Sequence, residues 1–261
     1  MPFTQIGALK YYKFDLLQEG GLAQGIFTRT GGVSPAPWDS LNFGGTVGDT
    51  RVNVIENRLR LFNALNRKVE SLFDVWQVHG TKIICSDTPR SLDAPHKEAD
   101  AILTDRPDIT LFMRFADCVP IFLFDPKRKV IGIVHAGWMG TVNRIVSMAI
   151  DAMVNRYGSK PENVLAGIGP SIGPDHYGIG DEVIKQVKQT FGSDASGLLI
   201  AIDGGIHLDL WEANRILLQR SGVRRIQIAG ICTHCHIDDW YSHRGEHGKT
   251  GRFGAILALS H

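Results

Sequence analysis

The chain has 261 residues, of which 43% are hydrophobic and 21% charged, and its formal net charge is +1 at pH 7. These are the values of an ordinary globular protein with a real core, and they give no broad electrostatic attraction to nucleic acid or to anionic membranes. The sequence has no run of about 18 consecutive apolar residues, no signal-peptide pattern, and four cysteines without disulfide-framework spacing. We therefore expect a cytoplasmic protein with no nucleic-acid partner and no membrane partner.

The first predicted elements are a strand at Leu22–Thr28 and a helix capped by Asp49 or Thr50. This helix carries apolar residues at helical spacing, and we expect them to face the core. They are Val52, Ile55, Leu59 and Phe62.

The rest of the chain alternates short apolar runs with a few amphipathic segments. Strands are predicted at Thr81–Ser86, Ile109–Phe115, Val119–Phe124, Val130–His135, Val164–Ile168, Arg225–Ile231 and Phe253–Leu259. Helices are predicted at 142–157, 181–191 and 211–220. Short turns between consecutive strands, as at Asp125–Lys129, favour an α+β fold with mixed or antiparallel sheets. Without a repeat or a linker, residues 1–261 are predicted to form a single domain.

Three short segments combine metal-ligand or nucleophile side chains with strand ends or glycine turns, where side chains can point into a cleft. They are Trp76-Gln77-Val78-His79-Gly80, Ala116-Asp117-Cys118-Val119-Pro120 and His135-Ala136-Gly137-Trp138-Met139-Gly140-Thr141. Taken singly, each has a plain structural explanation, since a free cysteine is usually a small buried hydrophobe. Spacing alone does not bring His79, Cys118 and His135 into one site.

Many further motifs follow one another in a recognisable order. They run from Gly25-Ile26-Phe27-Thr28-Arg29-Thr30-Gly31-Gly32 through Leu41-Asn42-Phe43, Glu56-Asn57-Arg58, Gln77-Val78-His79-Gly80, Ala116-Asp117-Cys118, His135-Ala136-Gly137-Trp138 and Gly169-Pro170-Ser171-Ile172-Gly173-Pro174 to Tyr241-Ser242-His243-Arg244 and Thr250-Gly251-Arg252. In this order the chain resembles the YfiH-like family over nearly its whole length. That family was long catalogued as multicopper, laccase-like polyphenol oxidases, and its members are understood as purine nucleoside phosphorylases with adenosine deaminase activity.

The resemblance implies a fold, a metal site and a reaction. The implied fold is a layered α/β/β/α sandwich, and the implied metal ligands are His79, Cys118 and His135, which are also the implied catalytic residues. Three ligands with an open fourth position are typical of a catalytic Zn²⁺ site, although Cu²⁺ suits the same ligands. The implied reaction converts adenosine, inosine or methylthioadenosine and phosphate to free base and ribose 1-phosphate, with deamination of adenosine alongside.

A phosphorylase also needs side chains that bind phosphate and nucleoside. Arginine suits phosphate best because its guanidinium is planar and bidentate. The candidate substrate-binding residues are Arg29, Arg58, Arg244, Arg252 and Asn42. An aromatic wall for the base is expected from Phe43, Trp138 or Tyr177, and Asp100 and Asp117 are expected either to orient the ligand histidines or, for Asp117, to cap a turn.

The chain departs from the family pattern at Met139, where arginine is frequent, and at Asp175-His176-Tyr177, where the family often has Cys or Asn. Three alternatives stay open. The first is a copper-dependent polyphenol oxidase, with which His234-Cys235-His236 is compatible. The second is a cysteine hydrolase or amidase acting on cell-wall precursors, with Cys118 as nucleophile and His135 as base. The third is a non-catalytic metal-binding protein. The Cys232-x-x-Cys235 pair would need a second pair of ligands to hold a structural zinc.

Overall fold

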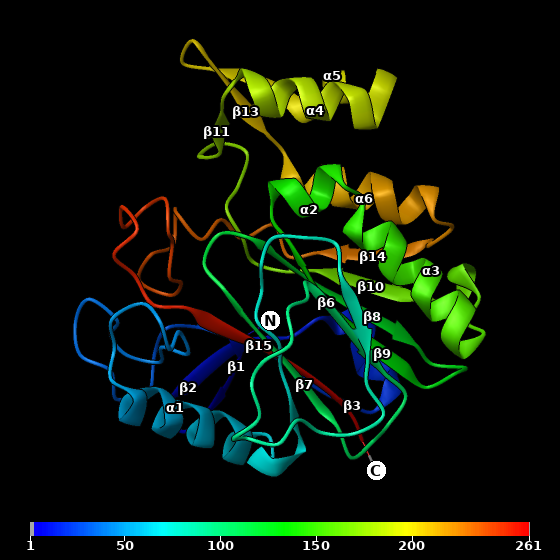
Figure 1. Cartoon of the computed structure of the whole chain (residues 1–261). Coiled ribbons are helices and arrows are strands. Elements are labelled where there is room, and N and C mark those ends of the chain that lie inside the picture. The colour runs from blue at the N-terminus through cyan, green and yellow to red at the C-terminus, as the bar shows by residue number, and fades with distance from the viewer. Residues whose placement is uncertain (1–2, 261) are drawn as a thin grey trace.

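Two six-stranded mixed sheets pack face to face in the computed structural model, which describes residues 3–260 (Figure 1). The first sheet has the order β1 (Phe3–Ile6), β2 (Leu9–Tyr12), β3 (Leu22–Phe27), β15 (Phe253–Leu259), β7 (Thr110–Phe115), β4 (Leu72–Phe73). The second has the order β14 (Arg225–Ile228), β10 (Leu165–Ile168), β8 (Val119–Asp125), β9 (Val130–Ala136), β6 (Ala101–Thr104), β5 (Ile83–Cys85). Most neighbours are antiparallel, while β4–β7, β5–β6 and β10–β14 are parallel, so both sheets are mixed.

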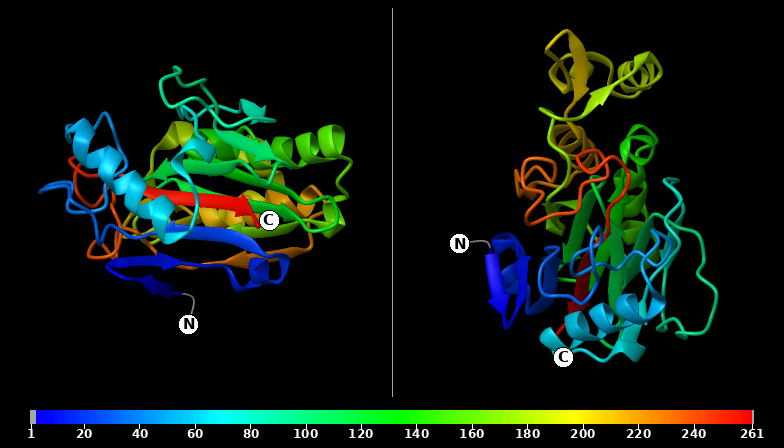
Figure 2. Two further views of the ribbon diagram at one scale, coloured as in Figure 1. Left: turned by 90° about the horizontal axis from the view of Figure 1, so that it is seen from below. Right: turned by 90° about the vertical axis from the view of Figure 1, so that its left-hand side faces the viewer.

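The helices of the described residues are α1 (Arg51–Ala64), α2 (Trp138–Val142), α3 (Ile145–Tyr157), α4 (Asp181–Phe191), α5 (Ala195–Leu198) and α6 (Leu210–Arg220), with short 3₁₀ turns at Asp15–Gly20, Val69–Ser71, Pro161–Asn163 and Gly192–Asp194. Helix α1 covers the outer face of the first sheet, α2, α3 and α6 lie over that of the second, and α4 and α5 lie apart at one end (Figures 1 and 2). A small sheet of β11 (Gly178–Ile179), β13 (Gly205–Leu208) and β12 (Leu199–Ile202) lies with α4 and α5 at one end of the molecule. No helix within residues 3–260 is both long and apolar enough to cross a membrane.

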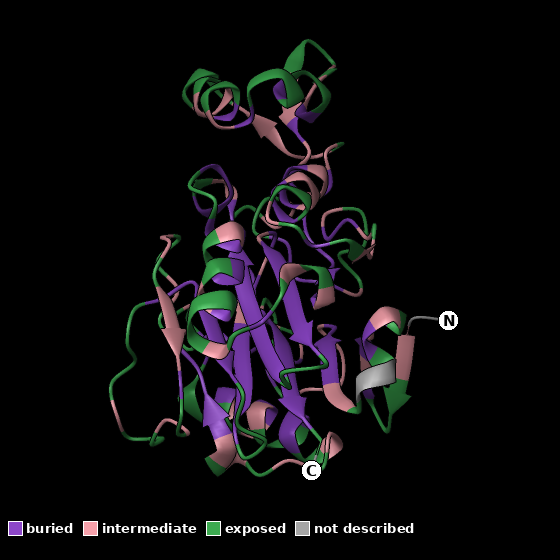
Figure 3. Ribbon diagram, turned by 90° about the vertical axis from the view of Figure 1, so that its right-hand side faces the viewer, coloured by how far each residue is buried: buried purple, intermediate pink, exposed green. Residues whose placement is uncertain are grey.

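Strand alternation divides the hydrophobic core into three layers. Along β8, Ile121 and Leu123 face the helices, whereas Phe122 and Phe124 face the other sheet, because successive side chains on a strand point to opposite sides. A third cluster lies between α1 and the outer face of the first sheet, where Phe62 is buried. Figure 3 shows the resulting buried strands between exposed helix surfaces. The predicted α+β class and α/β/β/α layering are confirmed.

The predicted helix at 142–157 corresponds to α3, which begins three residues later, and of the predicted range only Val142 belongs to α2. Arg144 has a left-handed backbone with φ of 61°, so α2 ends at Val142 and α3 begins at Ile145. The amide of Arg144 donates to the carbonyl of Thr141 at 2.9 Å and closes the last turn of α2. Periodicity alone did not reveal this break, because apolar side chains continue on the same face across it.

The predicted inward face of α1 is wrong at three of its four positions. Thr50 caps the helix as expected, since its hydroxyl accepts from the amide of Asn53, but Val52, Ile55 and Leu59 are 75%, 43% and 36% exposed. The buried face instead contains Val54, Asn57, Leu61 and Phe62. Part of the apolar stripe of α1 therefore faces a cleft rather than the core.

Candidate active site

The three ligand-type side chains meet where the chain crosses between the two sheets. His79 lies between β4 of the first sheet and β5 of the second, and Cys118 lies between β7 of the first and β8 of the second. His135 is on β9, directly opposite Pro120 of β8. Their ligand atoms all lie within 4.8 Å of one another, and the two imidazole rings are 4.9 Å apart. We call these three residues the cleft triad.

A fully buried carboxylate, Asp100, holds the two histidines of the cleft triad. It accepts the Nδ1 proton of His135 at 2.8 Å and the backbone amides of Val78, His79 and Gly80 at 3.2, 2.9 and 2.7 Å. Because Nδ1 of His135 is engaged, its Nε2 is the nitrogen left for a ligand. Burial by itself raises the pKa of Asp100, but the bonds from His135 and the amides outweigh burial and lower it. The expected orienting role of Asp100 matches this contact.

Asp117 fixes the turn that carries Cys118. Its backbone is left-handed, with φ of 80°, and its carboxylate accepts from the Thr233 hydroxyl at 2.7 Å and from the Arg244 amide at 2.6 Å. Of the two roles expected for Asp117, the structure favours that of a turn-fixing residue, because its carboxylate bonds to Thr233 and Arg244 rather than to a histidine of the cleft triad. It thereby ties Cys118 to the loop that carries Arg244.

Cys118 and His135 shift each other's ionisation. Burial raises the pKa of the Cys118 thiol, but the charge of His135 and hydrogen bonds from His135 and His79 outweigh it and lower the pKa to about 6. Burial lowers the pKa of His135, but the Cys118 thiolate and Asp100 outweigh it and raise the pKa to about 9. At neutral pH the pair is therefore a thiolate beside an imidazolium, and displacing one proton leaves two ligands for a metal.

The donor set and the space around it fit a metal ion. Two imidazoles and a thiolate are the ligands that Zn²⁺ and Cu²⁺ share, and three protein ligands leave a position for a substrate. Gly137 keeps this space open, because a Cβ there would lie 3.0 Å from the Cys118 sulfur and 3.3 Å from the His79 ring. The residues present therefore fit a catalytic metal.

The cleft triad opens into a cleft with a volume of about 950 Å³. Apolar side chains of α1 line one part of it, among them Val54, Ile55 and Leu59. Further lining residues come from the crossings and from the C-terminal loop: Trp76, Gln77, Phe115, Tyr177, His243, Arg244 and Arg252. This volume lies within the range of roughly 300–1,000 Å³ that is usual for small-molecule sites.

Arg58, Arg90 and Arg114 form a cluster in the wall of the same cleft, and of these three only Arg58 was predicted from the sequence. Asp74, 1% exposed, binds Arg90 at 2.6 Å and His96 at 3.0 Å, and lies 3.6 Å from Arg114. The Nε atom of Arg58 is buried without a hydrogen-bond partner, and burial lowers the pKa of its guanidinium. Arg114 could have been noticed in the sequence, because it is the one charged residue within the largely apolar strand β7.

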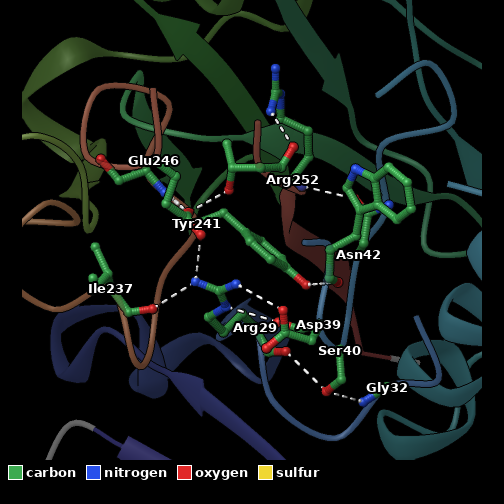
Figure 4. A network of polar contacts seen from close by, with 12 residues as sticks. Arg29, Gly32, Asp39, Ser40, Asn42, Ile237, Tyr241, Glu246 and Arg252 are labelled. Atoms are coloured by element: carbon green, nitrogen blue, oxygen red, sulfur yellow. Dashed lines mark hydrogen bonds and ion pairs between the residues drawn. The ribbon is translucent and has the colours of Figure 1, made fainter. Parts of the chain in front are cut away.

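Arg29 does not line the cleft. Its guanidinium donates to the carbonyls of Asp39 and Ile237 at 2.8 Å each and to the carboxylate of Glu246 at 3.0 Å, and it lies over the ring of Tyr241 (Figure 4). With these partners Arg29 holds the segment around residue 39 against the C-terminal loop. Arg29 was expected from the sequence to contact the substrate, but its position outside the cleft wall does not fit that role.

Asn42 is fully buried and does not line the cleft either. Its amide group donates to the carboxylate of Asp49 at 2.9 Å, and its oxygen accepts from the amides of Gly44 and Arg252, both at 2.8 Å (Figure 4). Gly44 and Arg252 do line the cleft. Asn42 therefore acts on the cleft through its neighbours rather than as a direct partner for ribose or base.

Arg244 and Tyr177 lie together in the cleft wall. The guanidinium of Arg244 lies 5.3 Å from the centre of the Tyr177 ring and donates to the carbonyl of Gly178 at 3.2 Å. Of the three expected aromatic wall residues, Tyr177 and Phe43 line the cleft, whereas Trp138 packs against the core beneath the helices. Tyr177 thus offers a ring surface next to a cation.

Comparison with known sequences gives a consistent result. Residues 23–260 match the model of a family described as multi-copper polyphenol oxidoreductase laccase. The purine nucleoside phosphorylase of Deinococcus radiodurans is 38% identical over 235 residues, covering 89% of this chain and 87% of that protein. The purine nucleoside phosphorylase YlmD of Bacillus subtilis is 34% identical over 243 residues, covering 90% and 87%.

Solved structures share the fold over the full length. The Bacillus licheniformis hypothetical protein YfiH superimposes with a TM-score of 0.92 at 33% identity and covers 99% of each chain. YlmD from Geobacillus stearothermophilus superimposes with a TM-score of 0.92 at 32% identity and covers 100% of this chain and 99% of the other.

Proposed function

The chain belongs to the multi-copper polyphenol oxidoreductase laccase family, and from that premise we propose that it is a metal-dependent purine nucleoside phosphorylase, the activity for which its similar proteins are named. The preferred metal in this proposal is zinc. The observation that carries the proposal is a single cleft that contains both an open metal-ligand triad and an excess of arginine.

The arginine cluster supplies the binding site for phosphate. One buried carboxylate, Asp74, does not neutralise the guanidinium groups of Arg58, Arg90 and Arg114. A buried Nε without a hydrogen-bond partner, as in Arg58, is unfavourable, and a phosphate oxygen would satisfy it. Charge-assisted, bidentate bonds to phosphate are the interaction for which arginine is best suited.

The apolar part of the cleft suits a purine nucleoside. Ile55 and Leu59 expose apolar surface to it, and Phe115 and Tyr177 add aromatic side chains. A purine has flat apolar faces, so burial against these side chains would favour binding and exclude water from the sugar. Exclusion of water matters in phosphorolysis because phosphate must attack C1′ of the ribose in place of water.

The cleft triad would hold the metal with its open position toward the cleft. Bound there, Zn²⁺ supplies Lewis-acid chemistry to an oxygen of the substrate. Asp100 keeps the His135 ring in the orientation that presents Nε2 and holds the backbone of His79. The same site supports the proposed side activity, deamination of adenosine to inosine.

The copper-oxidase alternative has less support. A trinuclear copper cluster needs several His-x-His ligand pairs. Among residues 3–260, two groups of three or more ligand-type side chains lie close enough to hold a metal, and together they contain three histidines, His79, His135 and His176. Neither group includes His234 or His236, so we favour the phosphorylase. Weak copper binding at these groups would still allow some phenol oxidation in vitro.

A cysteine hydrolase is the second candidate, and a specific observation favours it. The Cys118 thiolate lies beside His135, which is oriented by Asp100, and this is the order of groups in a nucleophile–base–acid triad. His79 distinguishes the two proposals, because a second imidazole on the thiolate serves a metal but has no role in the hydrolase. Metal dependence of the activity therefore separates them.

The test is incubation of metal-verified protein with adenosine, with and without inorganic phosphate, followed by chromatography. We expect adenine and ribose 1-phosphate to form with saturating dependence on phosphate, together with some inosine. Stripping the metal with a chelator should stop base release, and adding Zn²⁺ should restore it. Absence of base release under both conditions, with robust copper-dependent oxidation of phenols, would replace this proposal by the oxidase.

Arg58 tests the phosphate site. Loss of a charge-assisted hydrogen bond costs about 1.5–3 kcal/mol, so Arg58→Ala should raise the KM for phosphate by about 10- to 100-fold and leave the KM for adenosine nearly unchanged. Arg58→Lys should restore only part of this, because lysine lacks the planar fork. Arg60→Ala is the matched control, since Arg60 is on the same helix, exposed and ion-paired with Glu56. Equal effects of Arg58→Ala on both substrates would argue against a phosphate contact.

A further inference from the structure

A second group of ligand-type side chains lies outside the residues that line the cleft. It consists of Asp175, His176, Cys232 and Cys235, whose ligand atoms lie within 4.8 Å of one another. The Cys-x-x-Cys pair lacked a second pair of ligands in the sequence. The structure supplies that pair from the loop between β10 and β11. We call these four residues the loop cluster.

Four distances within the loop cluster are close to the edges of a zinc tetrahedron. His176 Nδ1 lies 3.8 Å from the Cys232 sulfur, 3.4 Å from the Cys235 sulfur and 3.0 Å from an Asp175 carboxylate oxygen. The Cys235 sulfur lies 3.3 Å from the same oxygen. Zinc bonds of about 2.0–2.3 Å at tetrahedral angles require donor separations of about 3.3–3.8 Å, so three of these four distances fall in that range and the His176–Asp175 distance is about 0.3 Å shorter. A metal at the centre would therefore need only small shifts of these side chains.

We propose that the loop cluster binds one Zn²⁺ ion through two thiolates, one imidazole and one carboxylate. Four protein ligands close the coordination sphere, so this ion holds structure rather than activating a substrate. Hydrogen bonds alone account less well for the arrangement, because Nδ1 of His176 faces both sulfurs and the carboxylate at once. A Cys232–Cys235 disulfide would leave His176 and Asp175 without a common partner.

The proposed ion would join two loops that already touch. The amide of Thr233 donates to the carbonyl of Ser171 at 3.0 Å, and the amide of Gly173 donates to the Cys232 sulfur at 3.2 Å. The residue after His176 is Tyr177, which lines the cleft and carries Arg244 over its ring. Zinc in the loop cluster would therefore restrain the backbone next to Tyr177 and with it the position of this part of the cleft wall.

The test uses metal content, which does not depend on whether the chain is a phosphorylase. In the Cys118→Ser background, which removes a ligand of the cleft triad, we expect about one zinc ion per chain to survive dialysis against a weak chelator. Adding Cys235→Ser, or separately His176→Ala, should remove that ion. Cys85→Ser is the matched control, because Cys85 is a free cysteine outside both groups, and it should leave the zinc content unchanged.

Cobalt gives a second readout that reports the ligands directly. After replacement of zinc by Co²⁺, the Cys118→Ser protein should retain sulfur-to-cobalt charge-transfer absorption and the strong visible bands of a tetrahedral site. Adding Cys232→Ser and Cys235→Ser to that protein should abolish both the charge-transfer absorption and the visible bands. The proposal is overturned if Cys118→Ser protein, purified under reducing conditions, holds no zinc, if the added substitutions leave its zinc content unchanged, or if thiol titration finds Cys232 and Cys235 joined as a disulfide.

Discussion

As proposed metal sites, the cleft triad and the loop cluster offer the same kinds of ligand for different ends. The cleft triad has three ligands, is held from beneath by the buried Asp100, and opens into the cleft. The loop cluster has four ligands, two of them on exposed residues, and joins two loops. If both proposals hold, the number of ligands and their support, rather than their chemistry, separate a site for reaction from a site for structure.

The largest expected effect comes from breaking the cleft triad at its sulfur. Cys118→Ser should lower the rate of phosphorolysis on the order of a thousandfold, because Lewis-acid stabilisation is worth several kcal/mol and about 1.4 kcal/mol is tenfold. The fold should persist, since Cys118 is only partly buried at the edge of the core. Steady-state rates, metal analysis and thermal melting together check this. Full metal occupancy with unchanged turnover would remove Cys118 from the ligand set.

Acidification should weaken metal binding at the cleft triad in two stages. Between about pH 9 and about pH 6 the Cys118–His135 pair holds one proton, and below about pH 6 it holds two. Bound protons compete with the metal, so affinity rises with pH, by about tenfold per unit in the upper window and about a hundredfold per unit below it. Chelator competition in a Cys235→Ser protein measures this without the loop cluster. An affinity that does not change with pH would contradict the proton-bearing pair.

Asp100→Asn tests whether the hydrogen bonds to a buried carboxylate distinguish the cleft triad from the loop cluster. An amide cannot accept with both atoms as the carboxylate does from His135 and the amides of Val78, His79 and Gly80. Loss of such a supporting partner typically costs about 10- to 100-fold in metal affinity or activity. We expect a loss of that size in zinc affinity at the cleft triad and none at the loop cluster. Asp87→Asn, at an exposed ion pair, is the control.

The sequence located the long strands but not their neighbours in the sheets. Phe253–Leu259 is predicted and observed with the same ends, because an unbroken apolar run is a strong signal. Its place between β3 and β7 depends on contacts across most of the chain, which no local pattern contains. Strands of two residues, such as β4 and β11, are too short to show alternation.

The site divides in the same way. The grouping of His79, Cys118 and His135 in one site was implied by the family resemblance that the ordered motifs carry, not by their spacing, and the structure brings all three together. Arg58 and Arg244 line the cleft as expected, whereas Arg29 makes bonds elsewhere. A sequence shows that a side chain is charged, but it does not show which residue that side chain contacts. The loop cluster shows this most clearly, because its ligand pairs are more than fifty residues apart along the chain.

The smallest expected effect concerns the two histidines that flank Cys235. His234 stacks on His176 with ring centres 4.0 Å apart, and neither His234 nor His236 belongs to a group of metal ligands or lines the cleft. Such stacking is worth about 0.5–1.5 kcal/mol, which affects the packing of the loop but not the ligands. His234→Ala combined with His236→Ala should therefore keep phosphorolysis within about twofold and zinc content unchanged.

The combined His234→Ala and His236→Ala substitution also tests whether this segment takes part in the reaction or serves only the structure. If the segment held a catalytic copper, copper-dependent phenol oxidation would fall and phosphorolysis would not. If phosphorolysis collapsed with the cleft triad still loaded, the segment would belong to the active site and the division between reaction and structure would fail. Parallel assays of base release, phenol oxidation and metal content on the same preparations separate these results. We expect base release and zinc to stay together at the level of the parent protein, because the two substituted side chains supply no metal ligand: Cys235 and His176 belong to the loop cluster, and His234 stacks on the His176 ring.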